Sequence, residues 1–192
     1  VYTVSQATQG LATYLNAHYE NPTVAIARDS RNKGEDFVKA AAGVLAANGI
    51  KSYVYPRIEP VPTLSFATRD LHCSAGIAVT ASHNPAPYNG YKVYWEHGGQ
   101  CGPEQANEIY SRMARFDYFG IPAMQEDEAR EKGLLATIDR HTDEAYYAAT
   151  ATLLQWPRLL AQRGDDLKLV YTPLHGSGLV PVTELLARVG LT

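Results

Sequence analysis

The sequence predicts an α/β fold in which helices and strands alternate and the strands are at least partly parallel. Short apolar runs typical of buried strands alternate with segments whose apolar residues recur every three or four positions, the period of a helix with one buried face. Strands that are joined through helices run parallel within one sheet. A turn signal, Asn89-Gly90, then separates two strand-like runs at 76–80 and 91–95, which are expected to pair antiparallel.

The elements before residue 80 follow this alternation. Their predicted order is a helix with its apolar stripe at Val4, Ala7, Leu11 and Leu15, a strand at 23–27, a helix with its stripe at Phe37, Val38, Ala41, Ala42 and Leu45, a strand at 52–55, a helix at 63–71 and a strand at 77–79. Asn48-Gly49 predicts a left-handed end for the second helix. The proline-rich segment 56–62 is expected to be a rigid connection.

The pattern after residue 90 is less regular. The predicted order is a strand at 91–95, a helix at 103–115, a charged connecting region at 126–139, a longer helix at 143–160, a strand at 167–172 and a helix to about residue 189. Pro157 and Gly164-Asp165-Asp166 interrupt the pattern, so a domain boundary is expected near 155–166.

We therefore expect one domain at 1–155, and at 156–192 a linker with the first strand and helix of a second, similar domain. The chain opens at Val1, already in a helical pattern, and stops where another strand would follow. The sequence is accordingly expected to be an N-terminal piece of a longer protein, whose remaining domains would be its partners.

Composition excludes several classes of protein. Hydrophobic residues make up 45% of the chain and charged residues 19%, which is typical of a globular protein. The net charge of -3 argues against nucleic acid as a partner, and no apolar run approaches the length of a membrane span. Cys73 and Cys101 lack a CxxC spacing and no signal peptide opens the chain, so a reducing, cytoplasmic location is expected.

The stretch TASHNPAPYNGYKVYW at 80–95 places Ser82 beside His83 in a loop rich in turn residues. Such residues are also common in ordinary turns, so the residues alone leave a plain loop equally open. Neighbouring side chains on extended backbone point apart, which makes His83 a poor base for Ser82, and no GxSxG motif is present. The six histidines have no close ligand spacing for a metal.

Phosphoryl transfer fits this loop better. A serine hydroxyl at the end of a buried strand, surrounded by loop N–H groups, is suited to hold a phosphate, and a phosphoserine needs a nearby cation. Lys92 follows ten residues later on the returning strand, where alternation places it on one face with Tyr94. A lone lysine on a strand is more often simply solvated, and this alternative stays open from the residues alone.

Four motifs together resemble the α-D-phosphohexomutase superfamily, the phosphoglucomutases and phosphomannomutases. They are the phosphoserine signature at 80–85 (TASHNP), its continuation at 89–95 (NGYKVYW), the loop at 28–31 (RDSR) and the segment at 171–178 (YTPLHGSG). The sequence most resembles the branch of bacterial phosphoglucomutases and phosphopentomutase-type enzymes. This resemblance implies a three-layer helix–sheet–helix first domain with a mixed sheet.

The resemblance also implies roles for particular residues. Ser82 would be the residue that is phosphorylated, Lys92 would aid proton transfer or stabilise developing charge, and His83 would be a second candidate for proton transfer. Asn84 would orient the phosphoserine loop together with His83. The remaining candidates for contact with substrate or phosphate are Arg28, Arg31 and His175.

For three of these residues the sequence offers a second interpretation. Loop arginines such as Arg28 and Arg31 are often surface ion-pair partners. His175 would either line a domain interface near the cleft or form hydrogen bonds within a glycine-rich turn. Ser177 has glycine on both sides and is interpreted as an ordinary loop residue.

The implied activity is transfer of a phosphoryl group between the 1- and 6-positions of glucose or mannose, with Mg²⁺ and a sugar bisphosphate such as glucose 1,6-bisphosphate as cofactors. Pentose phosphates, or a non-catalytic relative that binds sugar phosphates, are the alternatives. The family's three-aspartate Mg²⁺ loop is absent from this sequence, so Ser82 would contact the metal only through its phosphate. The stretch Ala86-Pro87-Tyr88 replaces a usually more polar one, which is expected to stiffen the loop.

Overall fold

Five strands form one mixed sheet in the computed structural model, which describes residues 1–191. The strand order is β4-β3-β1-β2-β5. All neighbouring strands are parallel except β4, which runs antiparallel to β3. In chain order the elements are α1 (Tyr2–His18), β1 (Thr23–Arg28), α2 (Gly34–Ala47), β2 (Lys51–Val54), α3 (Val61–Asp70), β3 (Ala75–Val79), β4 (Tyr91–Trp95), α4 (Pro103–Met113), α5 (Glu126–Glu131), β5 (Leu135–Thr137), α6 (Arg140–Ala151), α7 (Pro157–Arg163), a 3₁₀ turn (Gly164–Asp166) and α8 (Leu179–Arg188).

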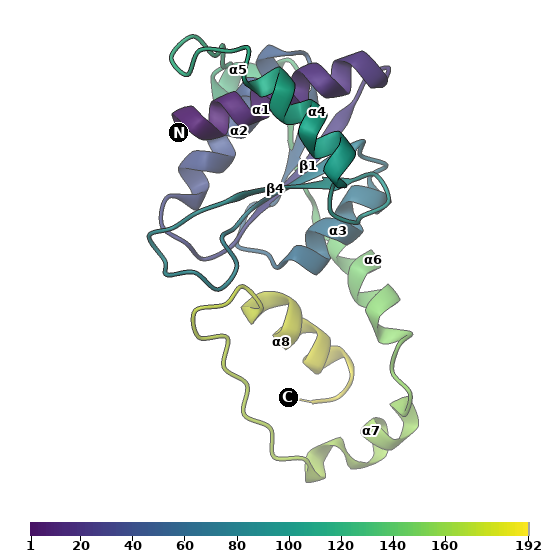
Figure 1. The fold of residues 1–192 in the computed structure, drawn as a ribbon. Helices are drawn as coiled ribbons and strands as arrows, with labels where there is room; N and C mark the ends of the chain where they lie inside the picture. The colour runs from purple at the N-terminus through teal and green to yellow at the C-terminus, as the bar shows by residue number, and fades with distance from the viewer. Residues whose placement is uncertain (192) are drawn as a thin grey trace.

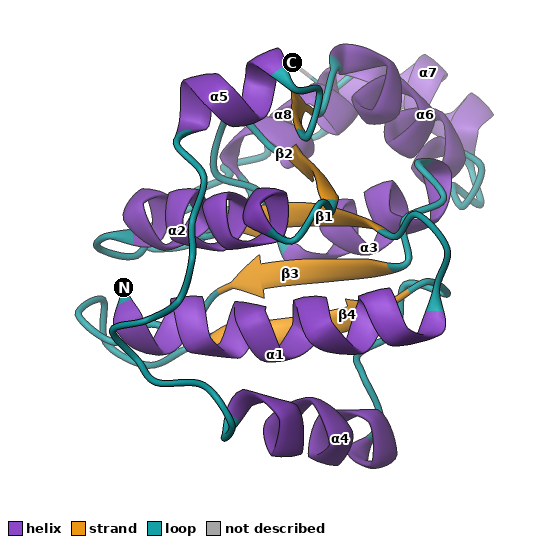
Figure 2. Cartoon of the chain, turned by 90° about the horizontal axis from the view of Figure 1, so that it is seen from above, coloured by secondary structure: helices purple, strands orange, loops and turns teal. Residues whose placement is uncertain are grey.

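The sheet lies between two layers of helices (Figure 1, Figure 2). Successive strand residues point to opposite faces, so Val24 and Ile26 of β1 pack with α1 and α2, while Ala25 and Ala27 pack with α3. Helix α4 lies on the outer side of α1 (Figure 2), and α6 contacts α3 on the other face. The predicted three-layer α/β fold with a mixed sheet is therefore confirmed.

Two predictions for the middle of the chain were wrong. The region 126–139, expected to be only a connection, contains α5 and the edge strand β5. Six- and three-residue elements carry too little periodicity to be recognised, and β5 forms because β2 offers it a free edge. The long helix expected at 143–160 is two helices, because Pro157 cannot lie inside an unbroken helix. Helix α6 ends at Ala151, and Pro157 occupies the first turn of α7.

The strand expected at 167–172 is also absent from the described residues. This segment is extended but pairs with no other strand, and Val170 is 92% exposed. A strand needs a neighbour to satisfy its backbone groups, and no described strand lies beside this segment. The helix predicted to follow it is present as α8.

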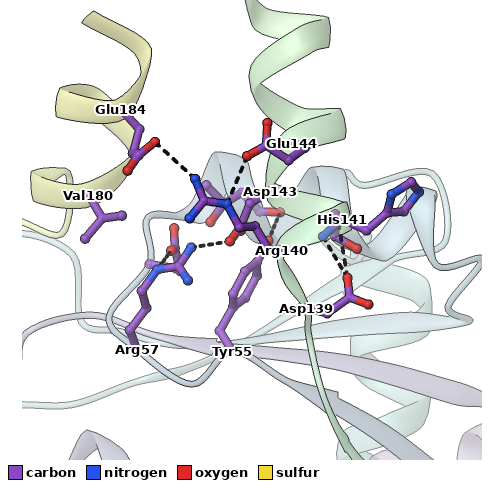
Figure 3. Close-up of polar contacts among 12 residues, drawn as sticks. Tyr55, Arg57, Asp139, Arg140, His141, Asp143, Glu144, Val180 and Glu184 are labelled. Atoms are coloured by element: carbon purple, nitrogen blue, oxygen red, sulfur yellow. Dashed lines mark hydrogen bonds and ion pairs between the residues drawn. The ribbon is translucent and has the colours of Figure 1, made fainter. Parts of the chain in front are cut away.

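The chain turns back toward the sheet before α8 (Figure 1), and α8 contacts α6. Charged side chains of the two helices meet at this junction. Arg188 Nη2 lies 2.7 Å from Glu144 Oε1, and Arg140 Nη2 lies 3.9 Å from Glu184 Oε2 (Figure 3 labels Arg140, Glu144 and Glu184). Hydrogen bonds from Arg188 and Arg140 lower the pKa of the Glu144 carboxyl. The junction places the loop before α8 near the end of the sheet. Within residues 1–191, no helix combines the length and the hydropathy needed to cross a bilayer.

Candidate active site

A cavity of about 260 Å³ opens at the carboxyl ends of β1 and β3. The chain leaves β1 toward β2 on one side, whereas β3 lies on the other side, so this is a switch point of the sheet. Ligands of open α/β sheets bind in the crevice at such a point. The lining residues are Ala27, Arg28, Asp29, Glu59, Val61, Ala78, Val79, Thr80, Ser82, His83, His175, Gly176 and Ser177.

Ser82 is exposed at this cavity, three residues beyond the end of β3. Its φ of 57° lies in the left-handed region, which non-glycine residues rarely occupy. Such a backbone persists only where surrounding contacts enforce it, and residues of this kind cluster at functional sites. The loop therefore presents a serine hydroxyl to the cavity on a constrained turn.

Arg31 lies against the back of this loop and makes most of these contacts. Its Nη1 donates to the carbonyl oxygens of Pro85 (2.8 Å) and Tyr88 (3.2 Å), and its Nη2 donates to the carbonyl oxygen of Ser82. Its side chain is only 7% exposed, and its Nε donates to Asp29 Oδ2 at 3.0 Å. Arg31 is not among the residues that line the cavity.

Asp29 and Thr80 follow the two adjacent strands β1 and β3 and complete the support of the loop. Thr80 Oγ1 is 2.5 Å from Asp29 Oδ2, and the backbone N–H of Ser82 donates to Thr80 Oγ1 at 3.0 Å. Sequence reasoning quoted both residues within motifs but gave neither a role. The available signal was that each directly follows an apolar strand, at one edge of the same sheet.

The two loop arginines thus occupy different places. Arg28 lines the cavity, and its Nη2 is 3.6 Å from Glu35 Oε2, a carboxylate that is itself largely exposed. Arg28 is therefore a partner in a surface ion pair, as one of the two interpretations expected, and it still lines the cavity. Only Arg28 of the pair has a place in the wall from which it can meet an anion.

The predicted histidines both line the cavity. His83 follows Ser82 directly, and His175 reaches the site from the loop before α8. His175 has a φ of 64°, and its carbonyl oxygen accepts a hydrogen bond of 3.2 Å from Ser30 Oγ. His175 therefore both lines the cavity and belongs to a hydrogen-bonded turn. Its neighbour Ser177, interpreted from the sequence as an ordinary loop residue, also lines the cavity.

Lys92 and Asn84 lie next to the cavity and not in its lining. Lys92 is half-buried on β4, directly opposite Ala78 of β3, which does line the cavity. As expected, its neighbour Tyr94 packs on the α3 face of the sheet. The backbone N–H of Asn84 donates to the Ala81 carbonyl oxygen at 3.2 Å and so tightens the turn. The role predicted for the Lys92 ammonium remains a prediction.

Glu59 is a lining residue that sequence reasoning missed, because it lies in a segment treated only as a connection. Its side chain is fully buried, Arg57 Nε lies 2.7 Å from its Oε1, and neither carboxylate oxygen accepts an aligned hydrogen bond. Burial raises the pKa of the Glu59 carboxyl. Arg57 also donates to Asp143 Oδ2 at 2.6 Å, which links the cavity wall to α6 (Figure 3).

These features define a three-layer α/β domain with a cavity at its switch point, whose wall includes an arginine, two histidines and an exposed serine. Residues 1–118 match the family model described as "Phosphoglucomutase/phosphomannomutase, alpha/beta/alpha domain I". The chain belongs to the phosphoglucomutase/phosphomannomutase family.

Similar curated proteins carry the names of both enzymes. The chain is 35% identical over 191 residues to a "Probable phosphomannomutase" of Haemophilus influenzae, covering 98% of this chain and 37% of that protein. It is 33% identical over 189 residues to a phosphoglucomutase of Staphylococcus saprophyticus, covering 98% of this chain and 33% of that protein. The chain thus spans about a third of the length of these relatives.

Solved structures show the same fold. The crystal structure of a "putative phosphomannomutase" from Thermus thermophilus superposes with a TM-score of 0.80 at 28% identity, covering 100% of this chain and 40% of that one. Parafusin, a phosphoglucomutase from Paramecium, gives a TM-score of 0.74 at 16% identity, covering 98% of this chain and 38% of that one. At that identity the likeness to parafusin concerns the fold alone.

Proposed function

We propose that the full-length protein is a sugar-phosphate mutase that moves a phosphoryl group between the 1- and 6-hydroxyls of glucose or mannose through a phosphorylated Ser82. The observation that carries this proposal is the position of Ser82, exposed on a constrained turn in a cavity that also contains Arg28 and His83. Membership of a family whose named members are phosphoglucomutases and phosphomannomutases supports it.

In the proposed reaction, the phosphoryl group passes from Ser82 to the free hydroxyl of the bound sugar monophosphate. A P–O bond forms to the sugar oxygen as the P–O bond to Ser82 breaks; the sugar hydroxyl loses its proton and the Ser82 oxygen gains one. The resulting sugar bisphosphate then returns its other phosphoryl group to Ser82 by the reverse step. Catalysis of this kind depends on in-line positioning and on neutralising charge at the phosphoryl oxygens.

The described residues suit these tasks to different degrees. Both Arg28 and His83 line the cavity. Arg28 would neutralise phosphoryl charge, and His83 would exchange a proton with the reacting oxygens. His175, which reaches the cavity from the other side, would contact the sugar phosphate once it is bound. Lys92 would join them by extending its side chain from β4 past Ala78.

Mg²⁺ and a sugar bisphosphate such as glucose 1,6-bisphosphate are the expected cofactors. Residues 1–191 contain no group of three or more His, Cys, Asp or Glu side chains that could hold a metal ion. Of the two cavity carboxylates, Asp29 is bound by Arg31 and Thr80, and Glu59 is buried beside Arg57. The described residues therefore do not supply a Mg²⁺ site by themselves, and no step above depends on one.

The first test is intact-mass analysis of the full-length protein followed by mutation. Phosphate is expected on Ser82, and Ser82→Ala is expected to lose both the phosphate and mutase turnover, because the Ser82 hydroxyl is the group proposed to carry the phosphoryl group between the two sugar positions. Ser111→Ala is the matched control, since Ser111 is an exposed serine on α4, away from the cavity. An unphosphorylated Ser82 together with a fully active Ser82→Ala variant would remove the proposed mechanism.

Substrate choice is tested with a panel of glucose, mannose, ribose and deoxyribose 1-phosphates. We expect the two hexose phosphates to be turned over most efficiently, since the named relatives are glucose and mannose enzymes. Preference for the pentose phosphates would reassign the substrate and keep the mechanism. Binding without turnover of any of them would instead favour a non-catalytic relative.

A further inference from the structure

Resting on the function proposed above, we infer that Asp29, Arg31 and Thr80 are positioning residues that together fix the orientation of Ser82. They are called the Ser82 clamp below. None of the three needs to contact the substrate for this role. The clamp also gives Arg31 a different task from the phosphate contact that sequence resemblance suggests.

The hydrogen bonds of the clamp form a closed ring around Ser82. The backbone N–H of Ser82 donates to Thr80 Oγ1, Thr80 bonds Asp29 Oδ2, Asp29 accepts from Arg31 Nε, and Arg31 Nη2 donates to the carbonyl oxygen of Ser82. Both backbone polar groups of Ser82 are therefore held by this one network. An interaction at each end of the residue constrains φ and ψ together.

Hydrogen-bond chemistry fixes which group donates and which accepts in each bond of the ring. An ionised carboxylate only accepts hydrogen bonds, so the Thr80 hydroxyl must donate its one proton to Asp29. The lone pairs of Thr80 Oγ1 are then left to accept from the N–H of Ser82. A valine at position 80 would remove both bonds with little change of shape, while a serine would keep both.

Arg31 has little capacity left for a substrate. Its side chain is 7% exposed, and its Nε, Nη1 and Nη2 all donate to Asp29 or to carbonyl oxygens of the loop. A lysine has a single nitrogen and does not reproduce the planar fork that reaches several carbonyls at once. Charge alone at position 31 therefore does not replace the clamp.

The clamp explains how Ser82 remains in a left-handed conformation that a non-glycine residue otherwise avoids. That conformation sets the direction of the Ser82 side chain, and with it the line along which a phosphoryl group approaches the sugar oxygen. Small errors in such alignment lower the rate of transfer much more than they weaken binding. Loss of the clamp is thus expected to lower kcat and to leave KM nearly unchanged.

The experiment compares steady-state kinetics of Thr80→Val, Thr80→Ser and Arg31→Lys in the full-length protein. We expect Thr80→Val and Arg31→Lys to lower kcat by about tenfold or more with KM within about twofold of the wild type. Thr80→Ser is expected to recover most of the lost kcat. Thr150→Val on α6 and Arg112→Lys on α4, which alter the same residue types away from the cavity, are the controls.

Hydrogen exchange of the loop amides at 82–90 gives a second readout that does not depend on turnover. Faster exchange is expected in Thr80→Val and Arg31→Lys and not in Thr80→Ser, with unfolding temperatures recorded for each variant. A rise in KM at constant kcat in Arg31→Lys would assign Arg31 to substrate binding and overturn the clamp. If Thr80→Val leaves both kcat and the exchange rates of the loop amides unchanged, the clamp is overturned as well.

Failure of the clamp can be distinguished from failure of the proposed function. Phosphate on Ser82 of the wild type, measured by mass, tests the function without reference to the clamp. If that phosphate is absent and Ser82→Ala is fully active, the proposed function fails, while loop exchange still decides whether the clamp exists. If the phosphate is present and the variants behave as the wild type, only the clamp is refuted.

Discussion

Gly90 closes the serine-bearing loop at the point where the chain enters β4. The backbone N–H of Thr80 donates to the carbonyl oxygen of Gly90 at 3.1 Å, so this hydrogen bond joins the two ends of the loop. A Cβ atom at this position would lie 2.5 Å from the Thr80 carbonyl oxygen, which is backbone and cannot swing aside. The need for glycine here is steric, because two segments of the same chain, at Thr80 and at Gly90, approach closely.

Gly90→Ala is therefore expected to lower the free energy of unfolding by about 1–3 kcal/mol, the usual cost of overpacking. Urea denaturation measures the change. Gly120→Ala is the matched control, because a Cβ at Gly120 meets no atom within 4 Å, and an effect within about 0.5 kcal/mol is expected there. Equal stability of the two variants would contradict the steric account of the loop closure.

The buried carboxyl of Glu59 leads to a second prediction about a single residue, which concerns the pH dependence of stability. Burial raises the pKa of this carboxyl in the folded protein above the ordinary value of 4.5. At a pH between 4.5 and the raised pKa, the folded protein therefore binds more protons than the unfolded chain. Stability then falls as pH rises from 4.5 through the raised pKa. The stabilisation from this group is fully present below pH 4.5 and is lost as pH rises through the raised pKa of the folded protein.

In Glu59→Gln, the decline in unfolding free energy from pH 4.5 to neutral pH is expected to be shallower than in the wild type, because the titrating group is gone. Urea denaturation at a series of pH values measures it. Glu131→Gln, at an exposed carboxylate of α5, reports what loss of a negative charge alone does. A decline as steep as that of the wild type in Glu59→Gln would show that the buried carboxyl does not titrate as described.

At the scale of elements, the junction of α6 and α8 differs from the rest of the molecule. Helix α8 contributes one buried residue, Pro181, so its contact with α6 rests mainly on charged side chains. Arg188 also lies over the ring of Tyr147, 4.7 Å from its centroid. Exposed ion pairs are weak and are screened by salt. The loop that carries His175 to the cavity thus depends on a junction that ionic strength can loosen.

Arg188→Ala is expected to speed amide hydrogen exchange in α8, and added salt is expected to do the same in the wild type. The reason is that Arg188 is the cation that joins Glu144 across the two helices. Lys132→Ala is the matched control, since Lys132 pairs with Glu128 inside α5 at 2.6 Å and joins no second element. Unchanged exchange in α8 on both treatments would mean that apolar contacts hold the helix.

At the scale of the whole molecule, the packed interior lies entirely in the first part of the chain. Both clusters of buried apolar residues draw their members from residues 11–138. Further along, large apolar side chains are exposed, among them Leu153, Trp156 and Leu174. This distribution agrees with the division we propose between a domain at 1–155 and a separate segment at 156–192.

Limited trypsin digestion of this chain is therefore expected to cut first after Arg158, Arg163 or Lys168, because backbone outside the packed interior opens most easily. Mass spectrometry of the first products identifies the sites. Arg57 and Arg112, which lie within the packed part, serve as internal controls that should resist cleavage. Early cuts at those two sites, at the same rate, would argue against the division.

The local features of this chain could be predicted from its sequence. Helix α1, strand β1 and the β3–β4 hairpin each follow from periodicity or from a turn signal over a few consecutive residues. Strand β5, the division of α6 from α7 and the unpaired segment at 167–172 could not be predicted in the same way. Whether a short run pairs depends on an edge supplied by residues far away in the chain.

The same distinction holds for the candidate site: some of its features could be predicted from the sequence, and others could not. By itself the sequence determined that Ser82 and His83 stand in a tight loop after a buried strand, because that information lies within a few consecutive residues. Only the tertiary structure decided that Arg31 holds this loop while Arg28 faces the cavity. About fifty residues separate these arginines from Ser82, and they meet it because sheet order makes β1 and β3 neighbours although α2, β2 and α3 lie between them in sequence.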